Sequence, residues 1–260
     1  MIRGCFRHVR GVGPFREAVL RERGFVSWDD CLTRDGEIPF NGKRRKAFLD
    51  EIRKSIQARD DRNIDYFTST FPTAEHWRIL GSYFGDATFI DVETTGLSWH
   101  YSHASVIAAY HRGALFTFVY GENIDDFLSL ADEARLLVTF NGTCFDIPFL
   151  EKTFNIPSIG RPHVDLRWVA WHHGYRGGLK SIERRMGIRR PPSIDGIDGI
   201  EAVDLFFQWQ RGDASSRDRL VSYCSADVLS TYLVAERLLH RSGCVISQSN
   251  PDDFFAARVS

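Results

Sequence analysis

The sequence lacks several features that would point to a membrane or secreted protein. No run of about 18 apolar residues occurs in its 260 residues, so we expect no membrane-spanning helix. The first residues, MIRGCFRHVRGVG, contain no apolar segment of signal-peptide length. The five cysteines form no CxxC pair, so neither a disulfide framework nor a zinc site is expected. These absences predict a cytoplasmic protein with reduced thiols and no membrane partner.

A charge excess is also missing, because 33 Lys and Arg residues balance 34 Asp and Glu residues. Basic residues nevertheless gather in two places. Residues 1–54 hold 13 Lys or Arg against 8 Asp or Glu, including KRRK at 43–46, and residues 176–190 hold six basic residues against Glu183 alone. Each cluster is expected either to contact phosphates or to form a solvated charged surface.

The chain is expected to divide near residue 84. Residues 1–84 have the amphipathic pattern of helices, with a tight turn at Gly11-Val12-Gly13 that resembles a single helix-hairpin-helix element. Such a turn either binds the DNA backbone through its amides or is a plain connection. Residues 85–242 form the second predicted domain, and residues 243–260 a tail that is either disordered or docked back.

The second segment has the pattern of an α/β protein. Three runs rich in β-branched and aromatic residues follow one another with short connections, which favours an antiparallel meander. They cover 87–93, 105–111 and 115–121. Predicted helices then alternate with two further strands, and the chain is mostly helical after residue 166. The expected fold is a mixed sheet flanked by helices.

The first predicted strand ends in two carboxylates, Asp91 and Glu93. Residues i and i+2 of a strand point to the same face, so the two charges project together. Burying both without compensation is costly, and a divalent cation such as Mg²⁺ or Mn²⁺ would neutralise them. The alternative is an ordinary solvated pair at a turn.

Two further motifs carry candidate site residues. Asn141 ends a predicted strand and Asp146 opens the next helix, where an aspartate is often only an N-cap. Tyr223 and Asp227 lie four residues apart on a predicted late helix and therefore share one face. Alone, that pair is typical of packing and surface positions.

Together, the motifs D-x-E, N-x3-F-D and Y-x3-D resemble the DEDD (DnaQ-like) 3′–5′ exonuclease superfamily, in its tyrosine type. Their order and elements match, and the segments HVDLRWVAW, GGLKSIERRMGI and GIDGIEAVDLFFQW resemble the YprB-type ribonuclease H-like family. The strong resemblance covers roughly residues 73–240. The N-terminal segment resembles, more weakly, the leader of that family's nuclease domain.

The resemblance implies a ribonuclease H-like fold and a two-metal phosphodiesterase. It assigns Asp91, Glu93, Asp146 and Asp227 as ligands of two Mg²⁺ or Mn²⁺ ions, one activating water and the other stabilising the leaving 3′ oxygen. Tyr223 would orient the attacking water. The residues implied to contact the terminal nucleotide are Thr94, Thr95, Gly96, Leu97 and Asn141.

The expected function is therefore a metal-dependent nuclease, 3′–5′ on single-stranded ends, with DNA and RNA both open as substrates. A nucleic-acid-binding or scaffold module with little catalysis, and a phosphoryl enzyme acting on nucleotides, are the alternatives. Asp165 is expected to cap the next helix rather than add a fifth carboxylate. His163 is expected to be structural, and Cys144 and Cys224 to be small core residues.

Overall fold

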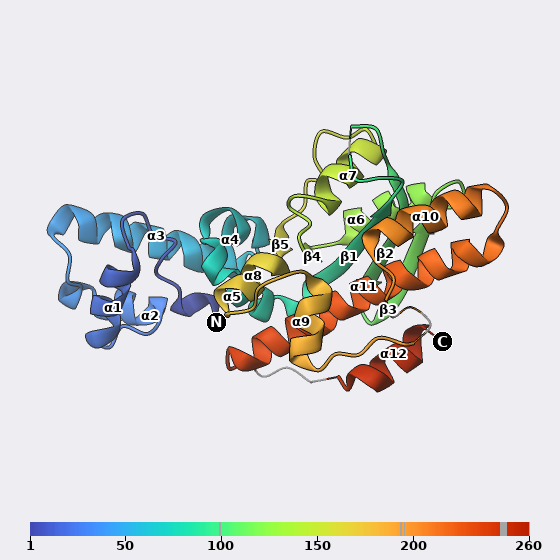
Figure 1. Ribbon diagram of the computed structural model, residues 1–260. Coiled ribbons are helices and arrows are strands. Elements are labelled where there is room, and N and C mark those ends of the chain that lie inside the picture. The colour runs from blue at the N-terminus through green and yellow to red at the C-terminus, as the bar shows by residue number, and fades with distance from the viewer. Residues whose placement is uncertain (99, 193, 195, 245–248, 260) are drawn as a thin grey trace. The chain divides into compact units, whose positions relative to one another are not determined.

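The computed structural model describes residues 1–98, 100–192, 194, 196–244 and 249–259. Within the chain, contacts divide the residues into two compact units, Met1–Phe84 and Gly85–Ser260 (Figure 1). The candidate site residues named above all belong to the second unit.

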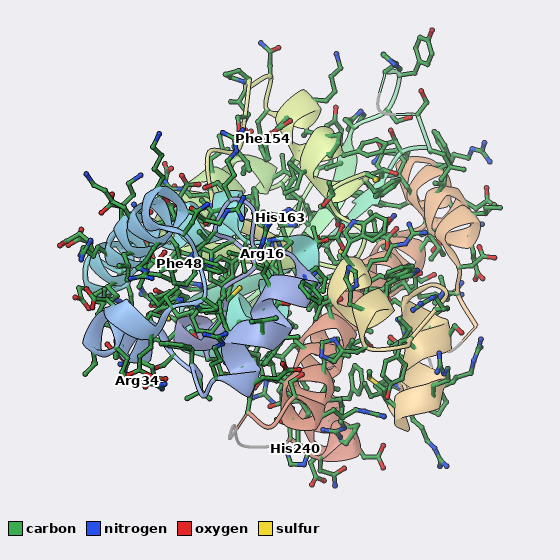
Figure 2. All side chains as sticks on the ribbon, turned by 90° about the vertical axis from the view of Figure 1, so that its left-hand side faces the viewer. Arg16, Arg34, Phe48, Phe154, His163 and His240 are labelled. Atoms are coloured by element: carbon green, nitrogen blue, oxygen red, sulfur yellow. The ribbon has the colours of Figure 1, made fainter. Side chains whose placement is uncertain are left out.

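The first unit is helical and is built around buried aromatic rings. Its helices are α1 (Pro14–Glu22), α2 (Trp28–Thr33), α3 (Gly42–Asp60), α4 (Ile64–Thr70) and α5 (His76–Ser82). Trp28 is fully buried, stacks on Phe67 and donates its indole N–H to the carbonyl oxygen of Cys5 at 2.7 Å. Phe48 of α3 points into the same core, whereas Arg34 lies on the outside of the unit (Figure 2).

The glycine turn of this unit stands directly before α1. Gly11 has a φ of 83°, a left-handed conformation that favours glycine, and Gly13 is the N-cap of α1. The residues before the turn form a 3₁₀ helix, Ile2–Gly4, and further turns. In the described part of this segment, only the second helix of a helix-hairpin-helix element is therefore formed. Backbone binding by the turn stays a prediction.

The second unit contains a five-stranded mixed sheet in the order β3-β2-β1-β4-β5. The strands are β1 (Ala87–Thr94), β2 (Ala104–His111), β3 (Ala114–Val119), β4 (Leu136–Thr139) and β5 (His163–Asp165). The pairs β1–β2 and β2–β3 are antiparallel, and β1–β4 and β4–β5 are parallel. The predicted meander and the predicted mixed sheet are thus confirmed.

Helices cover both faces of this sheet (Figure 1). They are α6 (Phe127–Glu133), α7 (Asp146–Thr153), α8 (Leu166–His172), α9 (Leu179–Met186), α10 (Gly199–Gln210), α11 (Ala214–Arg241) and α12 (Pro251–Val259). Ile90 and Val92 of β1 join the core under α6 and α7, whereas Phe89 packs its ring on Tyr232 of α11. Asp91 and Glu93 follow Phe89 by two and four residues, so their side chains point to the same face of the sheet as Phe89. Both carboxylates therefore face α11.

The C-terminal segment docks on this unit through α12. The Phe254 ring stacks on Tyr232 of α11 with centroids 5.0 Å apart, and Arg258 lies over Phe254. Of the two alternatives for the tail, docking is therefore the one observed for residues 251–259. Across the described helices, none combines the length and apolarity required to cross a bilayer.

We predict that Ser27→Ala destabilises the first unit by about 1 kcal/mol, because Ser27 and Asp30 form a reciprocal capping box at α2. Urea unfolding followed by tryptophan fluorescence, to which the buried Trp28 contributes, would measure this loss. Ser69→Ala, an exposed serine inside α4, is the matched control and should change the unfolding free energy by less than about 0.5 kcal/mol. Equal effects of the two substitutions would contradict the role of the cap.

Candidate metal centre

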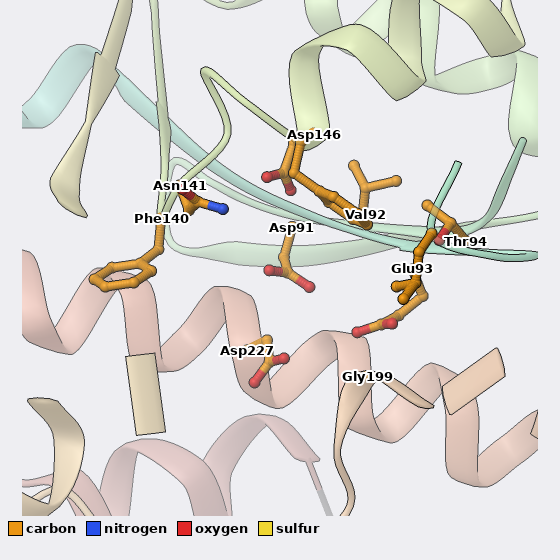
Figure 3. A pocket seen from close by; sticks show the side chains of 11 residues that line it. Asp91, Val92, Glu93, Thr94, Phe140, Asn141, Asp146, Gly199 and Asp227 are labelled. Atoms are coloured by element: carbon orange, nitrogen blue, oxygen red, sulfur yellow. The ribbon is translucent and has the colours of Figure 1, made fainter. Parts of the chain in front are cut away.

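Three carboxylates from two distant parts of the chain converge at one end of the sheet. Asp91 and Glu93 come from β1 and Asp227 from α11, and one carboxylate oxygen of each lies within 4.8 Å of the others (Figure 3). The convergence follows from the local geometry, because β1 presents the first two to the face that α11 covers. Glu93 and Asp227 are 134 residues apart in the sequence, and the packing of α11 on the sheet brings them together.

Asp146 lines the same cavity from the other side. The cavity has a volume of about 170 Å³, and its lining includes the four carboxylates, Leu97 and Asn141. Asp146 is buried as the first residue of α7, and Figure 3 shows its carboxylate on the side of Asp91. It provides no side-chain cap for α7, because the N-cap position is Phe145. The plain N-cap interpretation of Asp146 is therefore wrong.

The turn between β4 and α7 is held by Asp165. Its two carboxylate oxygens accept the amide N–H groups of Asn141 at 2.8 Å and Thr143 at 3.1 Å. One of them also accepts the amide of Arg167 at 3.0 Å, which caps α8 as predicted. Asp165 thus has a second task, fixing the turn that leads to Asp146, which the sequence analysis did not anticipate.

Gly142 lets this turn pass close to β4. A Cβ atom at Gly142 would lie 2.2 Å from Oγ1 of Thr139, which accepts the Gly142 amide at 3.0 Å. The same Thr139 hydroxyl is hydrogen bonded to Nε2 of His163 at 2.8 Å, which gives His163 the structural role expected for it. Asn141 itself has a φ of 72°, and its side-chain oxygen accepts a hydrogen bond from Arg167.

Burial raises the pKa of all four carboxyl groups, and repulsion from neighbouring carboxylates adds to the effect. Burial raises the pKa of Asp91 and of Glu93 well above the usual range, and in both cases Asp227 is the neighbouring charge that adds most. Burial also raises the pKa of Asp227, against the opposing effect of Arg190. The pKa of Asp146 rises to about 7, mainly through burial. Oxygen ligands that crowd and repel in this way fit a divalent cation, which would neutralise them.

Tyr223 lies one turn before Asp227 on α11, as the four-residue spacing predicts. Its side chain is buried, and the amine of Lys180 lies 4.8 Å from the ring centroid. Burial and the nearby carboxylates raise the pKa of Tyr223 far above its ordinary value. The phenol therefore stays protonated at neutral pH and can act only as a hydrogen-bonding group.

Arg190 departs from what the sequence analysis expected. It belongs to the basic stretch 176–190, which was expected to contact phosphates or to be solvated. Its side chain is instead 4% exposed and forms two hydrogen bonds with Glu183, of 3.0 and 2.6 Å. It also forms an ion pair with Asp227. Both interpretations are wrong for Arg190. The one acidic residue in this basic stretch, Glu183, is its partner and could have indicated the ion pair.

The residues after β1 form a folded loop at the rim of the cavity. Thr94 donates its hydroxyl to the carbonyl oxygen of Gly96 at 2.7 Å, and Thr95 pairs with the backbone of His103. Leu97 is 71% exposed although it lines the cavity. Thr94, Leu97 and Asn141 thus reach the cavity, whereas the contacts of Thr95 are made within the loop.

The two cysteines beside the site differ from each other. Cys224 is buried, as predicted, and its thiol lies 3.4 Å from the carbonyl oxygen of Asp91. Cys144 is exposed, so its assignment to the core is wrong. The reason is the turn before α7, which places Cys144 on its outer side while Asp146 is turned inward.

The family described as the RNase_H superfamily matches residues 88–239, which include all three motifs. The chain belongs to this superfamily. A DNA polymerase from Archaeoglobus fulgidus is 27% identical over 143 residues, which cover 45% of this chain and 17% of that polymerase. The chain thus spans less than a fifth of this curated relative.

Several solved structures also match part of the chain, at TM-scores below 0.5. The family B DNA polymerase of Pyrobaculum calidifontis is 19% identical with a TM-score of 0.49, over 59% of this chain and 24% of the polymerase. An apo form of a nuclease is 21% identical with a TM-score of 0.42, over 68% and 81% of the two chains. The EXO domain of Aedes aegypti Nibbler is 14% identical with a TM-score of 0.41, over 71% and 91%. Membership of the superfamily rests on the match to residues 88–239.

We predict that the metal-free protein loses stability as the pH rises from about 5 to about 8. The folded state keeps a proton on Asp146 up to a pKa of about 7, whereas the unfolded chain loses it near 3.8. The folded state therefore binds more protons in this window, and its stability falls with pH. Thermal melting in EDTA would measure the slope.

Two additions to this experiment test the cause. Asp146→Asn should reduce the slope, whereas Asp132→Asn, which changes an exposed aspartate of α6, should leave it unchanged. Mg²⁺ should raise the melting temperature more at pH 8 than at pH 5, since its ligands must be deprotonated. A slope of the opposite sign in the unsubstituted protein would contradict the raised pKa values.

We predict that Gly142→Ala destabilises the second unit by about 1–3 kcal/mol, because the new methyl group overlaps Thr139. It should also weaken binding of divalent cations, since the turn that carries Asp146 must move. Gly85→Ala is the matched control, because a Cβ there meets no atom within 4 Å. Urea unfolding and calorimetry with Mn²⁺ would measure the two effects, and an unchanged Gly142→Ala protein would refute the close approach.

Proposed function

We propose that the chain is a metal-dependent nuclease of the tyrosine-type DEDD class, similar to the YprB-type proteins. It would hydrolyse phosphodiester bonds from the 3′ ends of single-stranded DNA or RNA. One observation carries this proposal: Asp91, Glu93 and Asp227 place carboxylate oxygens within 4.8 Å of one another beside a cavity that Asp146 also lines.

The four carboxylates would hold two divalent cations, Mg²⁺ or Mn²⁺. Their raised pKa values support this role, because a divalent cation beside crowded, desolvated carboxyl groups would favour their ionised forms. When bound, such cations supply Lewis-acid polarisation of the phosphate and acidify the attacking water. Protein residues would then orient the reactants.

Tyr223 would orient the nucleophilic water through its hydroxyl group. Its high pKa keeps the phenol neutral, so it can donate one hydrogen bond and accept another without adding charge to the site. The packing of Lys180 against the ring fixes the side chain in place. This arrangement suits a positioning role and does not suit proton abstraction.

The size of the cavity limits which part of a nucleic-acid substrate it can enclose. Pockets that enclose small ligands usually measure about 300–1,000 Å³. A cavity of about 170 Å³ has room for a phosphate group and cations, but not for a whole nucleotide. The sugar and base would lie outside it, near the exposed Leu97 and Asn141, which would contact the terminal nucleotide with Thr94, Thr95 and Gly96.

The test is cleavage of 5′-labelled and 3′-labelled single-stranded DNA and RNA in Mg²⁺, Mn²⁺ or EDTA. We expect shortening from the 3′ end that requires metal. Asp91→Asn should reduce the rate by at least about 10³-fold, since an isosteric amide removes one ligand charge. Asp132→Asn, at an exposed aspartate outside the cavity, should retain full activity.

Each other result would change the proposal in a defined way. Cleavage at internal sites would keep the metal centre and replace the exonuclease by an endonuclease. Hydrolysis of mononucleotides alone would point to a nucleotide phosphohydrolase. Metal-independent binding of strands without cleavage would replace the enzyme by a binding or scaffold module.

A further inference from the structure

A buried ion-pair triad connects the candidate metal centre to the segment after α9. Arg190 lies between Glu183, the partner at 2.6 Å, and Asp227, a member of the carboxylate cluster. The side chains of Arg190 and Glu183 are each 4% exposed, and that of Asp227 is 12% exposed. Water screens these three charges only weakly, so the triad differs from an ordinary ion pair on the protein surface.

Arg190 binds the same carboxylate that a divalent cation would bind. A guanidinium ion and a metal ion both gain energy from the negative charge of Asp227, so the arginine contact weakens the attraction that remains for the metal. Lys180, the other nearby cation, donates to the carbonyl oxygen of Ile197 and packs on Tyr223 instead. Among the described residues, Arg190 is the cation with a recorded ion pair to this cluster.

Glu183 acts on Arg190 from the opposite side. Its two oxygens hold Nε and Nη2 of the guanidinium, and Nη2 is the same nitrogen that meets Asp227. Both acids therefore share one positive charge. Removing the charge of Glu183 would leave Asp227 as the sole carboxylate partner of Arg190 and would strengthen that pair.

We propose that Arg190 is a built-in counter-ion of Asp227 that sets how tightly the site binds divalent cations, with Glu183 moderating it. Arg190 is thus a positioning residue that acts through Asp227. This inference rests on the proposed function, since it concerns the same metal centre. It extends that function, because Arg190 would compete with the metal ion for Asp227, one of the proposed ligands.

The triad predicts effects of opposite sign for two sets of substitutions. Glu183→Gln should weaken binding of Mn²⁺ by about tenfold, because the metal must compete with a stronger arginine pair. The double variant Arg190→Gln/Glu183→Gln should tighten it by about tenfold, because Asp227 then loses the arginine that forms an ion pair with it. The double variant also leaves no isolated charge of the Glu183–Arg190 pair behind, which protects its folding.

Isothermal titration of the full chain with Mn²⁺ alone, without nucleic acid, would measure both effects. The matched control is the ion pair of Arg217 with Glu122, which lies outside the cavity in the same unit. Glu122→Gln and Arg217→Gln/Glu122→Gln should leave the affinity for Mn²⁺ unchanged. Thermal melting would establish that each variant is folded, and Glu183→Gln alone carries the test if the double variant is not.

The outcomes separate this inference from the proposed function. Shifts of opposite sign would support the competing counter-ion. Equal shifts in the same direction, or none, in a protein that binds Mn²⁺ and cleaves strands would refute the inference and leave the nuclease intact. Failure of the unsubstituted protein both to bind Mn²⁺ and to cleave would refute the proposed function itself.

Discussion

The repulsion among buried carboxylates at the end of β1 is the constraint on which the rest of this unit depends. Asp91 and Glu93 lie on a strand whose two faces are both covered by helices, and α11 adds Asp227 to the same face. Desolvation and like charge both oppose ionisation there. Apolar side chains at these positions would avoid the cost of desolvating charges, so the presence of carboxylates there indicates a functional role.

Several neighbouring features make sense as responses to that constraint. Tyr223 adds a neutral hydroxyl rather than another charge, and Cys224 fills the space behind Asp91 with a small side chain. Arg190 supplies one compensating charge, but only one against several acids, and Glu183 shares it. The acids at the site thus outnumber the cations beside them, so a bound divalent cation would compensate the charge that they gain on ionising.

Much of this arrangement could be predicted from the sequence, because it depends on short-range periodicity. The two-residue period of a strand places Asp91 beside Glu93, and the helical period places Tyr223 one turn from Asp227. The alternation of strands and helices was enough to predict the mixed sheet. The features that sequence reasoning missed depend on long-range packing: Arg190 is buried because α9 packs on α11, and Asp165 reaches the turn at Asn141 because β5 pairs with β4. The exposure of Cys144 follows from the same turn.

In the proposed function, the residues that would bind metal differ from the residues that would recognise the substrate. Under the proposed function, the cavity of about 170 Å³ would hold the phosphate and the cations, and residues on its rim would contact the rest of the strand. The rim residue Leu97 offers an exposed apolar surface, and Arg167 holds the side chain of Asn141. Substitutions at the rim should therefore act on substrate affinity and selectivity, whereas substitutions in the triad act on the metal, and the two sets of residues can vary independently.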